Sequence, residues 1–297
     1  MYKNIIPDLI SIDTNVKDIK GFVMCQNLDF YRNISKKLKF HYKIQLTNSI
    51  KPPEDYDFRS EYFIKKDNTW YYDRKFLSFH PAFKYNSLEK TFYFNKEYFF
   101  IPFRIGGTLT AGEHISNIIE LDLFLNGYNI LRGIALQKNG ETIGISGPGF
   151  NGKTSLLKKA LKSGSKYIAE DYLILNLTEK IVYPTCPLGK ENIWRNRKIN
   201  KELNILIKKN GYLDKSLKLD RLYLCQNSLS NKKKNNKKKL IDFLLLNSLY
   251  FLDNLFTRSY IYEGNLTERF FKRISELRNA NIDYEFIDIH NFNYKFI

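Results

Sequence analysis

The sequence has little of what disulfide-bonded and metal-binding proteins depend on. Only three cysteines and four histidines are spread over its 297 residues, and no Cys-x-x-Cys pair occurs. An odd number of distant cysteines predicts neither a disulfide framework nor a zinc site. We therefore expect the scattered cysteines and histidines to be ordinary core or surface residues.

Long apolar segments are also absent. No uninterrupted run reaches the length of about 18 apolar residues that a membrane-spanning helix needs. The most apolar stretch, residues 243–256, is broken by Asn247, Asp253 and Asn254, which predicts a buried helix. Asp8 and Asp13 lie where a signal peptide would be apolar. These patterns favour a cytoplasmic protein without a transmembrane segment.

Acidic residues are few relative to basic ones. The chain has 48 Lys and Arg against 31 Asp and Glu, a net charge of +17, and six of the lysines lie in the run Asn231–Lys239. The abundant Lys, Asn, Ile, Phe and Tyr all have A/T-rich codons, so genome composition can produce this bias. No recognisable nucleic-acid motif accompanies the charge. We therefore interpret the run as a solvated loop and do not expect nucleic acid as a partner.

The chain contains ample material for a hydrophobic core, with 43% hydrophobic and 15% aromatic residues. Residues 1–127 predict a mostly antiparallel β region that ends in a helix over Thr110–Gly127. Residues 128–297 alternate strand and helix patterns. The predicted fold class is α+β. The strand-like runs of the first region are 38–46, 61–66, 69–79, 90–95 and 97–103. Later predicted elements are a strand over 219–226, a helix over 265–280 and a strand over 283–289.

A phosphate-binding pattern, G-x-x-x-x-G-K-[ST], occupies Gly147–Thr154. The preceding Glu141–Ser146 predicts a strand, and residues 153–164 predict a helix. Between these elements, backbone N–H groups and the helix dipole can surround phosphate, a Walker A arrangement. The candidate nucleotide-binding residues are Gly147, Gly149, Asn151, Gly152, Lys153, Thr154 and Ser155. The alternative is a glycine-rich structural turn.

Two adjacent carboxylates, Glu170 and Asp171, interrupt the apolar strand pattern of residues 165–177. Burying them is unfavourable unless a cation or a substrate uses them. Mg²⁺ beside a phosphate loop needs carboxylate partners, so Thr154, Glu170 and Asp171 are candidate Mg²⁺ ligands. The alternative is a strand end or bend that exposes both carboxylates to water.

The strand entering the loop predicts an unusual topology. Leu131–Ser146 reads as two strand-like runs joined around Asn139-Gly140, a strong hairpin signal. The loop would then follow an antiparallel strand, whereas the common nucleotide-hydrolase fold enters its loop from a parallel sheet.

The order of these motifs resembles the core of the HPr kinase/phosphorylase family, which shares an atypical phosphate-loop fold with phosphoenolpyruvate carboxykinase. The matching segments are Gly147–Thr154, then Ala169-Glu170-Asp171, then Ile181–Pro187, so the resemblance covers about a fifth of the chain. Arg132-Gly133 stands where the family often has a histidine-containing motif. Glu170 replaces an Asp, and the downstream Arg-Gly-rich signature of the bifunctional enzymes is missing. The resemblance therefore does not imply HPr as the substrate.

The resemblance implies a phosphotransferase that uses ATP and Mg²⁺. Asp171 would be the catalytic base, and Lys153 would neutralise the transferring phosphate. Arg132, in the strand beside the loop, is a further catalytic candidate, and Arg195 and Arg197 are alternatives in a later segment.

Four functions stay open from the sequence. The leading hypothesis is a kinase acting on a hydroxyl, such as a serine of a peptide or protein. A sugar or other small-molecule kinase of the same fold is the second. A nucleotide-binding protein without turnover is the third, and a basic nucleic-acid-binding protein is the fourth. A homo-oligomer is an open alternative for the assembly.

Overall fold

The computed structural model describes residues 1–16, 19, 21–22, 24–25, 28, 30–60, 62–74, 80–99, 101, 109–149, 152–187, 197–225, 242–244, 259–261, 264–279 and 282–287. The chain divides into two compact units, Met1–Ser116 and Asn117–Ile297. This division falls within helix α2 (Ala111–Leu125), whereas the sequence prediction placed a boundary at the end of that helix. Helices and sheets occur together, so the α+β class is confirmed.

The first unit is built on one mixed sheet of eight strands within the described residues, in the order β1-β2-β3-β8-β7-β6-β5-β4. The β2–β3 and β3–β8 pairs are parallel and the other pairs are antiparallel, so the sheet is mostly antiparallel. Its strands are β1 (Lys3–Ile6), β2 (Ile10–Thr14), β3 (Phe40–Thr47), β4 (Phe58–Arg59), β5 (Phe63–Lys66), β6 (Thr69–Asp73), β7 (Ala82–Asn86) and β8 (Thr91–Asn95).

Aromatic rings fill the core of this unit. Phe83, Phe92 and Phe94 are fully buried, and Tyr85 stacks on Phe92 with ring centroids 4.4 Å apart. Alternation of aromatic and polar residues turns one set of rings inward along each strand, as in β6, where Trp70 and Tyr72 are buried. The predicted β region owes its core to this alternation.

One predicted strand of this unit is wrong. Residues 97–103 were expected to be extended, but Lys96–Phe99 form a helical turn, α1. The side-chain oxygen of Asn95 accepts a hydrogen bond from the Tyr98 backbone N–H at 3.0 Å. This N-cap satisfies a free donor of the first turn and overrides the β preference of the aromatic residues.

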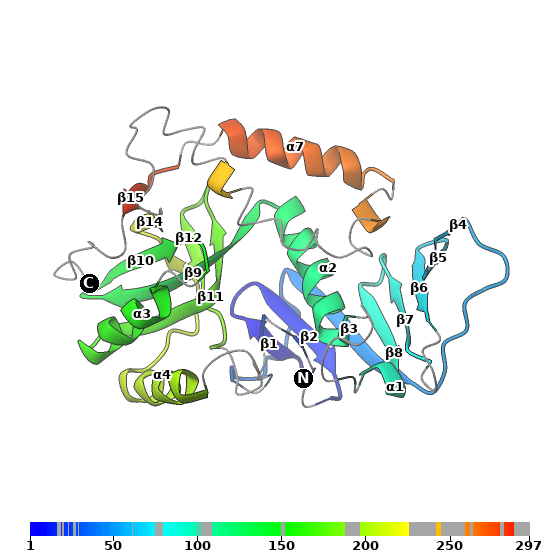
Figure 1. Cartoon of the computed structure of the whole chain (residues 1–297), viewed down its shortest axis with the longest axis horizontal. Coiled ribbons are helices and arrows are strands. Elements are labelled where there is room, and N and C mark those ends of the chain that lie inside the picture. The colour runs from blue at the N-terminus through cyan, green and yellow to red at the C-terminus, as the bar shows by residue number, and fades with distance from the viewer. Residues whose placement is uncertain are drawn as a thin grey trace. The chain divides into compact units, whose positions relative to one another are not determined.

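The second unit contains a sheet of seven strands within the described residues, in the order β13-β12-β11-β9-β10-β14-β15. The β10–β14 and β14–β15 pairs are parallel and the rest are antiparallel. Figure 1 shows β9 and β11 as the long central strands. The strands are β9 (Tyr128–Lys138), β10 (Glu141–Ser146), β11 (Lys166–Asn176), β12 (Ile181–Tyr183), β13 (Leu217–Lys218), β14 (Arg221–Cys225) and β15 (Glu285–Ile287).

The predicted hairpin forms between β9 and β10. Glu141 pairs with Lys138, and Asn139 and Gly140 between them have φ of 52° and 84°. Positive φ at both central residues is the pattern of a two-residue hairpin turn, which Asn-Gly favours. β10 thus reaches the loop antiparallel to β9, as the sequence predicted.

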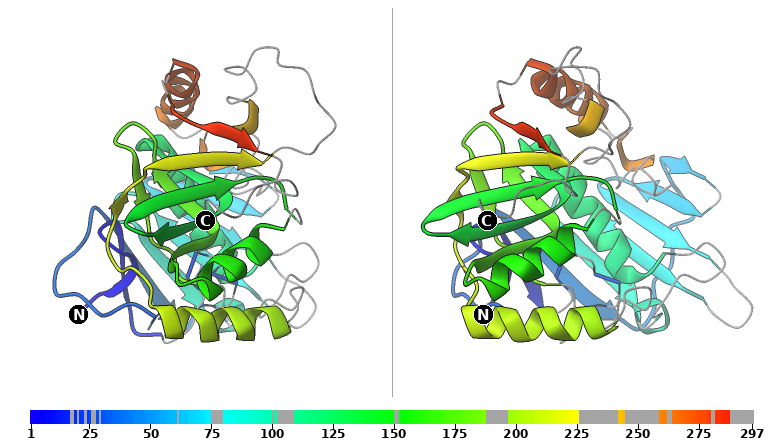
Figure 2. Two further views of the ribbon diagram at one scale, coloured as in Figure 1. Left: turned by 90° about the vertical axis from the view of Figure 1, so that its left-hand side faces the viewer. Right: turned by 60° about the vertical axis from the view of Figure 1, so that its left-hand side comes forward.

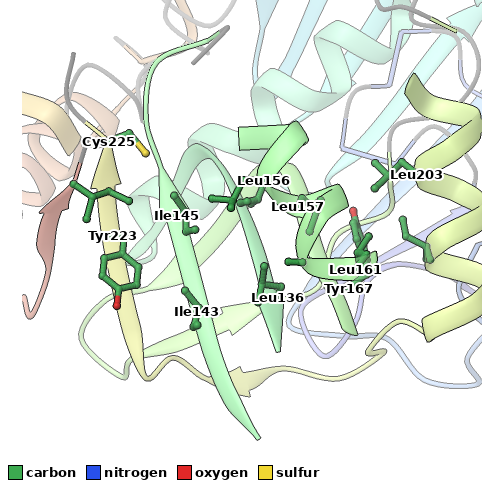
Figure 3. Packing of buried hydrophobic residues seen from close by; sticks show 14 residues of the cluster. Leu136, Ile143, Ile145, Leu156, Leu157, Leu161, Tyr167, Leu203, Tyr223 and Cys225 are labelled. Atoms are coloured by element: carbon green, nitrogen blue, oxygen red, sulfur yellow. The ribbon is translucent and has the colours of Figure 1, made fainter. Parts of the chain in front are cut away.

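Helix α3 (Lys153–Lys162) covers one face of this sheet, and α4 (Arg197–Asn210) packs on α3 (Figure 2). Leu156, Leu157 and Leu161 of α3 lie among strand residues such as Ile145 and helix residues such as Leu203 (Figure 3). Salt bridges from Lys158 and Lys162 to Glu202 join the two helices at their rim. The spacing of the apolar residues in α3 therefore creates the face that holds the helix, and the loop before it, on the sheet.

Helix α7 (Leu266–Asn279) is anchored through a buried arginine. Arg273 is 6% exposed and donates hydrogen bonds to the carbonyl of Gly127, at 2.8 Å, and to the side-chain oxygen of Asn129, at 3.0 Å. Burial lowers the pKa of this guanidinium from its ordinary value. These bonds tie α7 to the turn between α2 and β9.

Other sequence predictions have mixed outcomes. The helix over 110–127 is confirmed, with Thr110 and Glu113 forming its capping box. The helix over 265–280 and the strand over 219–226 are confirmed by α7 and β14. β15 confirms the core of the strand over 283–289. The lysine run 231–239 lies outside the described residues, as does 243–256 except for residues 243 and 244, which are helical.

Membrane-spanning helices were searched for over the described part of the chain. None of its helices is both long and apolar enough to cross a bilayer. Cys25, Cys186 and Cys225 are all buried, and none of the three forms a disulfide.

Candidate phosphate site between β10 and α3

A loop joins the end of β10 to the start of α3, and its base is anchored to β9. The Gly147 backbone N–H and the Ser146 hydroxyl both donate hydrogen bonds to the Arg132 carbonyl, at 3.0 and 2.9 Å. Gly152 precedes α3 with φ of 90°, a conformation that side-chain-bearing residues seldom adopt. The second glycine of the motif is therefore required by the backbone that turns into the helix.

The motif lysine is folded back over the loop. Lys153 is 8% exposed, and its ammonium group donates hydrogen bonds to the carbonyl oxygens of Gly147, at 2.8 Å, and Pro148. An ammonium group has three donors and can exchange such carbonyls for anionic oxygens. The lysine therefore lies inside the turn where a bound anion would need its charge.

The first turn of α3 contacts the acidic pair on β11. The Thr154 hydroxyl donates a hydrogen bond to Glu170 Oε1 at 3.1 Å, and Glu170 is only 1% exposed. α3 has no acidic residue in its first turn, and the first N–H groups of a helix have no intrahelical acceptor. The hydroxyl, the carboxylate and the positive end of the helix dipole therefore converge on one place.

Asp171 adopts an unusual backbone conformation beside this contact. Its φ is 66°, in the left-handed region, although it lies within β11. It is paired with Gly133 of β9, and a Cβ on that glycine would lie 2.7 Å from the Ile145 carbonyl oxygen. Non-glycine residues in this region of φ persist only where neighbouring structure enforces them, and they cluster at functional sites.

Arg132 lies on β9, directly opposite Tyr172 of β11. Its side chain is exposed, and its Nη1 is 3.4 Å from the position that a Cβ on Gly149 would take. The guanidinium therefore reaches the loop itself, which is where the sequence analysis placed a candidate arginine.

The acidic residue that the sequence analysis missed is Glu120 on α2. It is 4% exposed, and burial raises its pKa from 4.5 to about 8, against a hydrogen bond from Tyr172 and the charge of Arg132. A signal was present, because Glu120 interrupts the apolar run Ile118–Leu123. Only the folded protein brings this carboxyl to the Tyr172 hydroxyl, across the strand pair from Arg132.

The other predicted site residues are Ser155, Asn151, Arg195 and Arg197. Ser155 is exposed in the first turn of α3. Asn151 and Arg195 lie outside the described residues, and Arg197 is the first residue of α4. Within the described ranges, no three His, Cys, Asp or Glu residues gather as a metal cluster. Mg²⁺ is commonly held by one or two carboxylates with substrate phosphates and water, which a Thr–Glu pair can serve.

No protein-family model matches this chain, and no curated protein is significantly similar to it in sequence. The residues around the loop therefore carry the evidence on function.

Proposed function

We propose that this protein is an ATP- and Mg²⁺-dependent kinase of the HPr-kinase-like type, which transfers the γ-phosphate to a hydroxyl group. The observation that carries the proposal is the hydrogen bond from Thr154, at the start of α3, to the buried carboxylate of Glu170. A helix start, a lysine and a buried carboxylate have few uses together other than holding a phosphate with its cation.

The chain's own groups suit nucleotide phosphates. Three positive elements surround the loop: the Lys153 ammonium inside it, the Arg132 guanidinium beside Gly149 and the N-terminus of α3. Lys153 would exchange the carbonyls of Gly147 and Pro148 for phosphate oxygens, while Arg132 would supply a planar, permanently charged donor.

Thr154 and Glu170 would hold the cation. The hydroxyl oxygen and the carboxylate already share a hydrogen bond, and carboxylate and hydroxyl oxygens are ligands that Mg²⁺ accepts. The bound cation would supply charge neutralisation of the phosphates. With Glu170 engaged at Thr154, Asp171 is the carboxylate left for proton transfer.

In the proposed reaction, Asp171 accepts the proton of the acceptor hydroxyl. At the same time the oxygen of that hydroxyl forms a bond to the γ-phosphorus of ATP. The bond from that phosphorus to the bridging oxygen of ADP breaks, and ADP leaves. Lys153 and Arg132 balance the charge on the transferring group. A cytoplasmic location, where ATP is plentiful, is part of the proposal.

The acceptor is proposed as a hydroxyl, first a serine of a peptide or protein and second a sugar or another small molecule. A transfer assay with γ-labelled ATP and panels of both kinds of acceptor distinguishes them. Wild-type protein that binds ATP yet transfers phosphate to neither panel would favour a nucleotide-binding protein without turnover.

The variant that tests the role of the Thr154–Glu170 hydrogen bond is Thr154→Val, which removes the hydroxyl and keeps the shape of the side chain. It should weaken Mg·ATP binding by about tenfold, because one ligand to the cation is lost, and change metal-free ATP binding much less. Thr178→Val, the same substitution at an exposed threonine away from the loop, is the matched control. Equal losses with and without Mg²⁺ in calorimetry would contradict the assignment of Thr154 to the metal.

A further inference from the structure

The left-handed backbone of Asp171 has no turn to account for it. Six described residues other than glycine have positive φ, and five of them lie in turns between consecutive strands. Asp171, with φ of 66°, is the sixth and lies inside β11. Because no turn requires the left-handed region at this position, contacts with the neighbouring strands must enforce it.

Regular alternation along β11 would place the Asp171 side chain in an apolar layer. Residues two apart on a strand share a face, so Asp171 would point to the same side as Ala169 and Leu173, which are both fully buried. These two belong to one apolar cluster with the β9 residues two before and two after Gly133. An ionised carboxylate in that layer would lose its hydration without gaining a partner, which is costly. In the structure Asp171 is only half-buried.

Leu173 takes the place that faces Gly133. The register pairs Gly133 with Asp171, yet a Cβ on Gly133 would lie 3.1 Å from the Leu173 Cβ and 2.9 Å from its Cδ2. Facing residues of an antiparallel pair normally keep their Cβ atoms about 4.5–5.5 Å apart. The same Cβ would lie 2.7 Å from the Ile145 carbonyl oxygen of β10. Any side chain at position 133 would therefore collide with both neighbouring strands.

We propose that Gly133 is a positioning residue for Asp171: because it has no side chain, Leu173 can fill the apolar place opposite it, and Asp171 is held left-handed with its carboxylate out of the apolar layer. The adjacent Glu170 contacts Thr154 on the face that α3 covers. This inference rests on the proposed function for the role of Asp171 in proton transfer. Gly133 touches neither nucleotide nor acceptor and acts through Asp171.

The first experiment measures turnover and binding separately. Phosphate release from Mg·ATP, with water or an acceptor hydroxyl as the nucleophile, gives kcat, and calorimetry gives the Mg·ATP affinity. Gly133→Ala should lower kcat by about 10- to 100-fold, because a displacement of about 1 Å at a catalytic group can cost that much. The affinity should change less than kcat. Gly144→Ala on β10 is the matched control, since a Cβ there would meet only side-chain atoms, the nearest at 3.3 Å.

A double-mutant cycle separates positioning from general damage to the fold. In the Asp171→Asn background the carboxylate that Gly133 positions is already gone, so adding Gly133→Ala should lower kcat no further. Wild-type kcat in Gly133→Ala, or a loss that adds in full to that of Asp171→Asn, would overturn the inference. The kinase proposal would stand in either case, because ATP is still turned over.

Urea unfolding tests the same contact without any turnover. If the left-handed backbone is enforced, Asp171→Gly should unfold at a higher urea concentration than Asp171→Ala, since glycine adopts this φ without strain. Gly133→Ala should remove this advantage of glycine, because it disturbs the contact that enforces the conformation. If Gly133→Ala does not fold, Leu173→Ala opens the same place from β11 and should lessen the advantage.

Failure of this inference is distinguishable from failure of the proposed function. The role of Gly133 is refuted if glycine at position 171 gives no advantage in the otherwise wild-type protein, or if the advantage is undiminished in the Gly133→Ala or Leu173→Ala background. A folded wild-type protein that neither binds nor turns over Mg·ATP would refute the kinase proposal instead. The unfolding series would then still decide whether Gly133 holds Asp171 in place.

Discussion

The two units of this chain bury different kinds of residue. In the described part of the first unit, the buried core combines many aromatic rings with aliphatic side chains, and His114 is its only buried titratable side chain apart from tyrosine and cysteine. In the second unit Glu120, Lys153, Glu170 and Arg273 are all at least nine-tenths buried. Ionised groups are costly to bury, so a protein keeps them where they are paired or used.

The four buried ionisable side chains of the second unit separate into two groups. Arg273 satisfies backbone and side-chain acceptors at the start of β9 and so serves the fold. Lys153 and Glu170 flank the loop, and Glu120 is buried on α2, where burial raises its pKa against the hydrogen bond from Tyr172 and the charge of Arg132. The contrast supports the proposed site in the second unit, at the loop end of β9, β10 and β11.

The largest expected effect is on the carboxylate assigned to proton transfer. Asp171→Asn should lower phosphate transfer by about 10²- to 10⁴-fold, the usual contribution of a positioned general base. ATP affinity should change much less, since Lys153 and the loop backbone make the phosphate contacts. Steady-state transfer and calorimetry measure the two quantities, with exposed Asp214→Asn as the control. Transfer at the wild-type rate would remove Asp171 from the mechanism.

The second effect concerns the buried lysine. Lys153→Ala should weaken ATP binding by about 10²-fold, because two charge-assisted contacts to phosphate are lost. Lys159→Ala on the exposed side of the same helix should bind like wild type. Calorimetry with Mg²⁺ present, together with circular dichroism to confirm folding, checks both. If the two variants bind equally well, the loop is only a structural turn.

The third effect concerns the free energy of unfolding and its dependence on pH through the buried Glu120. The folded-state pKa of Glu120 lies above its ordinary value of 4.5, so the folded protein holds more protons than the unfolded chain between these values. Stability should therefore fall as pH rises from 4.5 towards 8. Glu120→Gln lacks this loss and should gain a few kcal/mol relative to wild type between pH 5 and pH 9. Urea unfolding at both pH values measures the gain; a constant difference would mean that Glu120 stays ionised in the folded protein.

The fourth effect tests whether Arg273 serves the fold alone. Arg273→Met keeps the length of the side chain but leaves the Gly127 carbonyl and the Asn129 side chain without their donor. We expect a loss of about 2–3 kcal/mol in the free energy of unfolding. Arg278→Met, exposed in the last turn of α7, should be nearly neutral. A large loss of ATP affinity in well-folded Arg273→Met would break the division between structural and functional charges.

The smallest effect is expected from the lysine run. Replacing Lys232–Lys239 with Gly and Ser should leave ATP binding unchanged, because the run is predicted to be a solvated loop. A large loss of ATP affinity would show that these lysines contribute to the site. A loss of acceptor binding alone would point instead to an acidic or nucleic-acid partner.

Much of the second unit was predictable because its signals are local. The Asn139-Gly140 turn, the apolar spacing of α3 and the Gly147–Thr154 pattern each depend on a few neighbouring residues whose backbone preferences are strong. The strand predicted over 97–103 was wrong because two local signals compete there. The Asn95 side chain caps the first turn of α1, and this cap outweighs the preference of the aromatic residues for a strand.

The sequence by itself determined the α+β class, the hairpin, the loop before its helix and the presence of an acidic pair nearby. Only the tertiary structure decided that Glu170, rather than Asp171, accepts the Thr154 hydroxyl, that Asp171 takes a left-handed backbone beside Gly133, and that Glu120 is buried with a raised pKa. The spacing of residues along the chain predicts which of them share a strand or a helix face. Which residues of separate elements meet depends on strand register and on the space that Gly133 and the packed helix leave, and these are properties of the whole sheet.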